Sequence, residues 1–261
     1  MKKLINKILS FFGAVIVSKQ TLDYLEKNSK KPPDYHTRND TKNQLIGNTF
    51  HLLKNAGFDP NHILDIGANR GTWTREVLTY FPNANYTLIE PQAQLKSYFE
   101  DLLERPQFVY LPIGIGQQQG HFNLTITERD DSCNFRLSNE EALQHGLKQI
   151  LVEVDTINNV IQNSSFGTPQ IIKIDAEGID LEVLKGASDV LGKTEVVLIE
   201  AAVVNPVFEN TVLSVINTMD KYGYKLFDIT DLNRPFKTKV LWLVELMFIL
   251  KDGQLNNKKW N

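Results

Sequence analysis

The stretch Asp65-Ile66-Gly67-Ala68-Asn69-Arg70-Gly71 joins a short apolar run at residues 61–66 to a helix predicted at residues 72–81. Its two glycines let the backbone turn tightly, and they let a ligand approach without a Cβ atom in the way. A second apolar run at residues 86–90 ends in an acid, Glu90, which can accept hydrogen bonds from two ribose hydroxyls. This succession of strand, glycine turn, helix and strand indicates a nucleotide-binding crevice at the carboxyl ends of parallel strands.

Strand-like and helix-like segments alternate beyond this stretch, which implies right-handed crossovers and a parallel sheet covered on both faces. The last two strands have no helix between them, so they must pair as a hairpin with the last strand antiparallel at or near the sheet edge. The fold class is therefore α/β, with a seven-stranded, mostly parallel sheet and helices on both faces. We expect helices at residues 41–57, 72–81, 92–104, 139–146, 179–191 and 209–222, and strands at residues 61–66, 86–90, 108–113, 120–127, 149–154, 170–175, 196–200, 225–229 and 240–250.

The composition limits the class of protein. Of 261 residues, 42% are hydrophobic and 23% are charged, which is typical of a globular chain. A single cysteine, Cys133, forms neither an internal disulfide nor a thiolate metal cluster, so we expect a reducing compartment, the cytoplasm. The net charge of −3 argues against a protein that follows nucleic-acid phosphates.

The first 40 residues differ from the rest of the chain, which predicts an extension at residues 1–40 and one domain at residues 41–261. Apolar residues recur at helical spacing within residues 1–20, with Lys2, Lys3 and Lys7 between them, and residues 28–40 form a polar linker. Lys7 interrupts the apolar core and no cleavage site follows, which argues against a signal peptide. Two interpretations stay open: a helix that packs on protein, and an interfacial helix that contacts anionic lipid peripherally.

The glycine turn also bears on the choice of nucleotide. A dinucleotide site favours the spacing G-x-G-x-x-G, whereas this turn has Gly67 and Gly71 separated by three residues. Asp65 stands directly before the turn, where it would repel a phosphate and suit an ammonium or sulfonium group. S-adenosylmethionine carries both cations, so we favour it over NAD. A NAD-dependent oxidoreductase and an inactive nucleotide-binding scaffold remain the alternatives.

Two further stretches carry a family resemblance: VEVDTI at residues 152–157 and IKIDAEGIDLEVLKGA at residues 172–187. Together with the glycine turn they resemble the FkbM-type methyltransferase family over roughly residues 61–199. The resemblance implies the Rossmann-like class I methyltransferase fold. It also implies S-adenosylmethionine-dependent methylation, most often O-methylation of a hydroxyl on a sugar, polyketide or other natural product. The acceptor would be a small molecule or glycan, and the oligomeric state is left open.

The resemblance also assigns site residues by position. The methionine side of the cofactor would lie at the glycine turn, the ribose at Glu90 and the adenine near the end of the third strand, at residues 113–115. Methyl transfer would take place at Asp175 and Glu177. The implied cofactor-binding set is Asp65, Gly67, Ala68, Asn69, Gly71, Glu90, Ile113 and Gly114.

An alcohol is a poor nucleophile at neutral pH, so a base or a metal ion should assist the transfer. Asp175, Glu177 and Glu200 each come at or just after the end of a predicted strand, and we expect them to converge as the catalytic group. Their mutual repulsion should raise one pKa, which favours a base. A divalent cation is the less favoured alternative, because no histidine lies in these segments.

Simpler interpretations stand beside these assignments. Asp175 and Glu177 could cap the helix that begins near Ile179, and Asp180 could serve the dipole of that helix. Asp155 is interpreted as the N-cap of a short helix, and Lys173 is assigned no role. Acceptor contacts are expected from loops at residues 28–40 and 201–210.

Overall fold

The structure is a computed structural model that describes residues 42–204, 208–258 and 260. The predicted helix at residues 1–20 and the linker at residues 28–40 lie outside these residues, as does part of the loop at residues 201–210. The boundary predicted between residues 40 and 41 stays a prediction.

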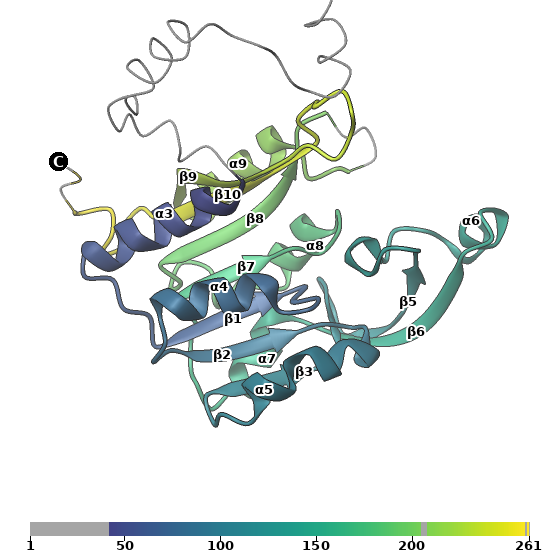
Figure 1. Cartoon of the computed structure of the whole chain (residues 1–261), viewed down its shortest axis with the longest axis horizontal. Coiled ribbons are helices and arrows are strands. Elements are labelled where there is room, and N and C mark those ends of the chain that lie inside the picture. The colour runs from purple at the N-terminus through teal and green to yellow at the C-terminus, as the bar shows by residue number, and fades with distance from the viewer. Residues whose placement is uncertain (1–41, 205–207, 259, 261) are drawn as a thin grey trace, which may run out of the picture. The chain divides into compact units, whose positions relative to one another are not determined.

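The main sheet has the predicted architecture (Figure 1). Five strands run parallel, and the last strand runs antiparallel to both of its neighbours. The strand order is β3-β2-β1-β7-β8-β10-β9, so the last strand lies one place inside the edge. The seven strands are β1 (His62–Ile66), β2 (Asn85–Ile89), β3 (Phe108–Leu111), β7 (Ile171–Ile174), β8 (Val196–Ala202), β9 (Tyr224–Asn233) and β10 (Leu243–Leu250).

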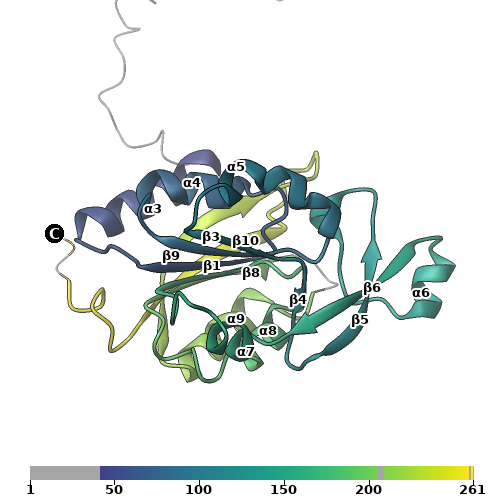
Figure 2. The ribbon, with the colours of Figure 1, turned by 90° about the horizontal axis from the view of Figure 1, so that it is seen from below.

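Helices cover both faces of this sheet (Figure 2). One face carries α3 (Lys42–Asn55), α4 (Thr72–Tyr80) and α5 (Glu100–Leu103), and the other carries α7 (Ile157–Gln162), α8 (Asp180–Lys185) and α9 (Val212–Lys221). Each face has its own buried apolar cluster. Both faces of the central strands are therefore buried, which is why β1 and β7 show near-continuous apolar sequence instead of alternation.

A second, smaller sheet was not anticipated. The strands predicted at residues 120–127 and 149–154 do not join the main sheet but pair with each other, antiparallel, as β5 (Gly120–Ile126) and β6 (Lys148–Asp155). A short strand, β4 (Gly114–Ile115), joins β6 on its other side. Figures 1 and 2 show β5, β6 and the short helix α6 (Asn139–Gln144) extending away from the main sheet.

Several predicted boundaries need correction. The segment at residues 92–104 begins as the 3-10 helix η1 (Ala93–Phe99) before α5, and α8 ends at Lys185, well before residue 191. Asp155 is not the N-cap of α7. Thr156 is, because its hydroxyl accepts a hydrogen bond from the Asn159 N–H. Asp155 instead accepts hydrogen bonds from the Thr156 N–H and the Asn159 side chain.

Candidate functional site

A cavity lies where β1, β2 and β7 end, and the loop after β5 forms its other wall. Seven of the predicted site residues line the cavity: Gly67, Asn69, Glu90, Ile113, Gly114, Asp175 and Glu177. Asp65, Ala68, Gly71 and Glu200 are not part of its lining. The site thus lies at the carboxyl ends of the strands, where open α/β sheets bind their ligands.

The glycine turn is tightly constrained. Gly67 has a φ of +75°, and a Cβ atom there would lie 2.0 Å from the carbonyl oxygen of Asp175. The N–H groups of Gly67 and Ala68 both donate to the carbonyl oxygen of Ile89, at 3.0 Å each. Asn69 also has a positive φ, of 47°, and lines the cavity. Only glycine at position 67 allows the turn to close against both neighbouring strands.

Glu90 lies at the mouth of β2 and is buried, with 3% of its surface exposed. One oxygen, Oε2, accepts a hydrogen bond from the Asn69 N–H, and the other, Oε1, accepts from the N–H and side-chain amide of Gln92. Burial raises the pKa of Glu90, and these hydrogen bonds oppose that increase. The carboxylate is thereby fixed in one orientation against the cavity.

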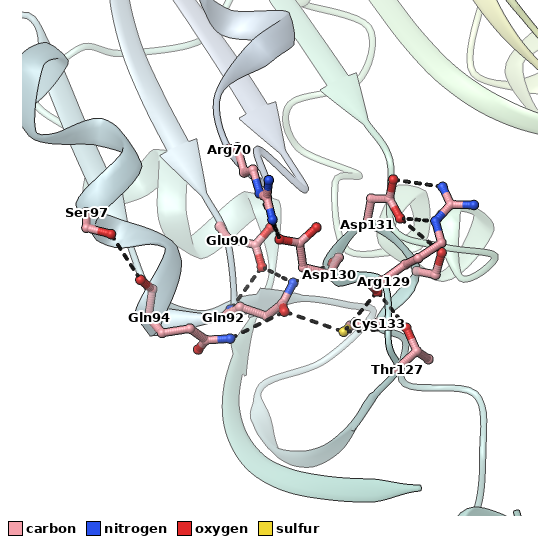
Figure 3. A network of polar contacts seen from close by, with 11 residues as sticks. Arg70, Glu90, Gln92, Gln94, Ser97, Thr127, Arg129, Asp130, Asp131 and Cys133 are labelled. Atoms are coloured by element: carbon pink, nitrogen blue, oxygen red, sulfur yellow. Dashed lines mark hydrogen bonds and ion pairs between the residues drawn. The ribbon is translucent and has the colours of Figure 1, made fainter.

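The loop after β5 is tied to this part of the site (Figure 3). Gln92 donates from its amide to the Asp130 carbonyl oxygen at 2.8 Å, and Cys133 donates from Sγ to the Gln92 Oε1 at 3.4 Å. Arg70 of the glycine turn forms an ion pair with Asp130, with 2.6 Å between Nη2 and Oδ2. Asp130 and Cys133 line the cavity, so these contacts hold one of its walls in place.

The predicted carboxylate group does come together electrostatically. Burial raises the pKa of Glu177, and repulsion from Asp175, Asp180 and Asp131 adds to this effect, so that the pKa reaches about 9. The pKa of Glu200 is also well above its ordinary value, because of burial and the negative charges of Asp175, Glu177 and Asp180. The Oε2 atom of Glu200 is buried without a hydrogen-bond partner. This mutual repulsion matches the arrangement expected of a group that accepts a proton.

Glu177 also occupies an unusual backbone conformation. Its φ is +51°, in the left-handed region that long side chains seldom adopt, and Gly178 follows with a φ of +96°. Such strain, on the order of 1–3 kcal/mol, persists where the surroundings fix the backbone, and it concentrates at functional sites.

The comparison with known families decides the class of protein. The family profile described as Methyltransferase FkbM domain matches residues 65–226, more than half of the chain. The chain belongs to the FkbM methyltransferase family. The resemblance seen in the glycine turn and the IKIDAEG stretch is thus confirmed, and the sheet order and antiparallel β10 confirm the class I methyltransferase fold.

Solved structures of other methyltransferases are similar at low identity. A precorrin-6y C5,15-methyltransferase from Geobacter metallireducens is 13% identical, with 81% of this chain and 89% of that chain covered and a TM-score of 0.46. A putative RNA methyltransferase from Pyrococcus horikoshii is 14% identical, with 85% and 90% covered and a TM-score of 0.45. The 1,6-didemethyltoxoflavin-N1-methyltransferase from Burkholderia thailandensis is 11% identical, with 92% and 93% covered and a TM-score of 0.43. No curated protein sequence matches the chain.

In this FkbM methyltransferase, Asp65 does not line the cavity, although the sequence predicts it as a cofactor-binding residue. The side chain is fully buried behind the glycine turn, not on the cavity wall. It accepts a hydrogen bond from the Thr74 hydroxyl at the start of α4, and its Oδ1 lies 3.8 Å from the ammonium of Lys173. The sequence pattern located the glycine turn correctly. The direction in which the Asp65 side chain points, however, depends on the packing of α4.

Asp180 is a structural part of the site that the sequence analysis assigned to the helix dipole. It is fully buried, and its carboxylate accepts hydrogen bonds from the N–H groups of Ala176 and Gly178, at 3.0 and 3.1 Å. Asn210 donates from its side chain to Asp180 and to the Glu200 carbonyl oxygen. Asp180 therefore holds the loop that carries Glu177. The sequence shows how far Asp180 lies from Asp175, but it does not show that the Asp180 side chain points toward this loop.

Two searches of the described residues concern metals and membranes. No group of three or more His, Cys, Asp or Glu side chains among them is placed to hold a metal ion. None of the helices within residues 42–204, 208–258 and 260 is long and apolar enough to cross a membrane.

Proposed function

We propose that this chain is an S-adenosylmethionine-dependent methyltransferase that methylates a hydroxyl group on a sugar, glycan or other natural product. The observation that supports it most directly is the cavity at the ends of β1, β2 and β7, where the glycine turn and Glu90 meet the carboxylates of Asp175 and Glu177. The family to which the chain belongs supplies the reaction class.

The residues of the cavity fit such a donor. Glu90 presents a fixed carboxylate for ribose hydroxyls, and Ile113 and Ile115 offer apolar surface for a purine ring. The glycine turn leaves room for the methionine part beside Asn69, and the Asp175 carboxylate gives the mouth a negative character that suits a cation. When bound, S-adenosylmethionine supplies a methyl group on a sulfonium centre and departs as a neutral thioether.

The chain's own part in the reaction is to position the acceptor and take its proton. With a pKa of about 9, Glu177 is protonated at neutral pH, and a positive charge beside it would lower that pKa. Burial and the neighbouring carboxylates also raise the pKa of Glu200. We therefore place proton acceptance from the acceptor hydroxyl on the group formed by Asp175, Glu177 and Glu200. A carboxylate base is preferred to a divalent cation, because no histidine lies in the segments that carry these carboxylates.

A ligand screen tests the cofactor. Saturation of the protein with S-adenosylhomocysteine at a hundred times its Kd should add about 2.7 kcal/mol to the free energy of unfolding, which is roughly 5–10 °C in Tm. NAD should produce no shift. Stabilisation by NAD alone would favour the oxidoreductase alternative, and the absence of any shift would favour an inactive scaffold.

An activity screen tests the acceptor class. The protein is incubated with methyl-labelled S-adenosylmethionine, a panel of glycans and natural-product alcohols, and DNA and RNA as comparison substrates. Label should enter a hydroxyl-bearing small molecule or glycan and no nucleic acid, and Asp175→Asn and Glu177→Gln should each lower turnover by at least about tenfold. Label found on nitrogen or carbon of the product would contradict O-methylation.

A further inference from the structure

The buried lysine of β7, Lys173, is the feature of the site that the proposed function leaves unused. It sits in the apolar sequence Ile171-Ile172-Lys173-Ile174, in the strand between β1 and β8, and 5% of its surface is exposed. Taking an ammonium group out of water costs several kcal/mol even after relaxation. Replacement of a whole buried ion pair by apolar residues of similar volume is often neutral or stabilising, so stability alone does not account for a charged pair in this central strand.

The contacts of Lys173 join two parts of the site. Its Nζ donates to the Asp175 Oδ2 at 2.9 Å and lies 3.8 Å from the Asp65 Oδ1. Lys173 is the register partner of Asp65 on β1, and Asp175 follows two residues later, on the same face. The ring of Trp73 lies beneath the ammonium, with 5.8 Å from Nζ to the ring centroid. One cation thus bridges a fully buried carboxylate and a carboxylate that lines the cavity.

Each member of this bridge has a distinct environment. Asp65 has one oxygen bonded to Thr74 and the other, Oδ1, without a hydrogen bond, so the ammonium is its charge partner. Burial lowers the pKa of Lys173, but the carboxylates of Asp175, Asp65 and Glu245 outweigh it and raise that pKa above its ordinary value. Glu245, on β10, is itself bonded to the Thr230 hydroxyl. The neighbouring carboxylates therefore favour the charged form of Lys173.

From these contacts we infer that Lys173 is a positioning residue, which holds the Asp175 carboxylate toward the methyl-transfer site while Asp65 balances its charge from behind. The inference rests on the proposed function. It gives Asp65 an indirect part: the acid before the glycine turn acts on the site through Lys173 and not by touching the donor. The backbone reinforces the arrangement, because the Asp175 N–H donates to the Ile66 carbonyl oxygen at 3.1 Å.

The variants are chosen to separate the placement of the Asp175 carboxylate from the net charge of the site and from the stability of the fold. Lys173→Met alone leaves two carboxylates without a counter-charge, and we expect it to be strongly destabilised for that reason. The double variant Asp65→Asn, Lys173→Met removes one negative and one positive charge, so the net charge of the site is unchanged. It also keeps a side-chain oxygen that can accept from Thr74. Tyr224→Phe is the stability control, since it loses the buried bond to the Thr194 carbonyl oxygen, at the opposite end of the sheet.

The measurement is the affinity of S-adenosylmethionine and of S-adenosylhomocysteine by isothermal titration calorimetry. The double variant and Asp175→Asn should each bind S-adenosylmethionine about tenfold more weakly, because a positioned carboxylate no longer faces the sulfonium. S-adenosylhomocysteine, which has no sulfonium, should change less than about threefold in either variant, and neither affinity should change in Tyr224→Phe. Combining the double variant with Asp175→Asn should add less than about threefold, because Lys173 acts through Asp175.

The outcomes distinguish the inference from the proposed function. If the double variant binds both nucleosides as wild type does, or if its effect adds fully to that of Asp175→Asn, Lys173 does not position Asp175 and the inference is wrong. The proposed function would stand in that case. If the wild-type protein binds neither nucleoside, the proposed function fails, and the inference fails with it.

Discussion

Single residues show how closely the site is built. Gly67 lies between two strand ends, and its missing side chain is what allows the Asp175 carbonyl oxygen to approach. Glu177 keeps a long side chain in a conformation that glycine would adopt more easily. The first position is a steric requirement, and the second fits the proposed chemical role of Glu177.

Gly67→Ala tests the steric requirement. The added Cβ would lie 2.0 Å from a backbone oxygen, so we expect a loss of at least about 3 kcal/mol in the free energy of unfolding, measured by urea denaturation. Gly57→Ala is the matched control, because Gly57 has a similar φ of +79° but no neighbour within 4 Å. It should lose only about 1–2 kcal/mol from the backbone conformation. Equal losses in the two variants would show that φ alone matters.

Glu177→Gln tests the raised pKa through stability. The pKa is about 9 in the folded protein and ordinarily 4.5, so the folded state binds this proton more tightly than the unfolded state. The stabilising contribution is complete below the ordinary pKa and is lost as the pH rises toward 9. The variant should therefore gain at least about 1 kcal/mol relative to wild type between pH 5 and pH 8.5 in urea denaturation. The exposed Glu153→Gln is the control, and a pH-independent difference would contradict the assignment.

For single residues, the sequence predicted the positions of the site more reliably than the contacts of each side chain. Gly67, Glu90 and Asp175 were found from strand ends and spacing, and all three line the cavity. Asp65 and Asp180 were given different contacts from those observed, because both are fully buried and their directions depend on neighbouring helices and loops. Periodicity reports which residues approach the end of a strand, but it carries no information about the rotamer that packing selects.

The two sheets contribute different parts of the cavity. The main sheet supplies the glycine turn, Glu90 and the carboxylates, and the loop between β5 and α6 supplies the opposite wall of the cavity. The sequence predicted β5 and β6 as strands but not their separate sheet. Both have alternating apolar residues, and alternation marks one buried face without saying which sheet buries it.

Arg70→Ala tests the attachment of that loop. Arg70 is exposed, so its ion pair with Asp130 is weak in solution. Loss of this ion pair should therefore not slow folding. We expect faster amide hydrogen exchange at residues 127–136 and binding of S-adenosylhomocysteine weakened by up to about fivefold. Lys251→Ala removes another exposed ion pair, with Asp220, and serves as the control. Unchanged exchange in the loop would show that the Gln92 contact to Asp130 suffices.

For the whole molecule, the parallel order and the final hairpin were predictable because crossover handedness and loop length leave few topologies open. The described residues that line the cavity all lie between Ile66 and Ile179. We propose that the protein is cytoplasmic and that residues 1–20 contact the membrane surface peripherally, through their apolar face and lysines.

Deletion of residues 1–20 tests this proposal. The full chain should partition onto vesicles that contain anionic phospholipid and much less onto neutral phosphatidylcholine vesicles, in a sedimentation assay. The shortened chain should lose this partition and keep its affinity for S-adenosylhomocysteine within about twofold, because the described lining of the cavity lies between Ile66 and Ile179. Equal partition of the two chains would remove the proposed membrane contact and favour a helix that packs on protein.

The position of β10 has a consequence for synthesis on the ribosome. β9 is made before β10, yet it can reach the sheet only through β10, which pairs with β8 on its other side. Until residues 243–250 leave the exit tunnel, the nascent chain carries β8 with one edge unpaired. An unpaired edge strand can pair with another chain, so the nascent domain is exposed to misassembly until β10 is made.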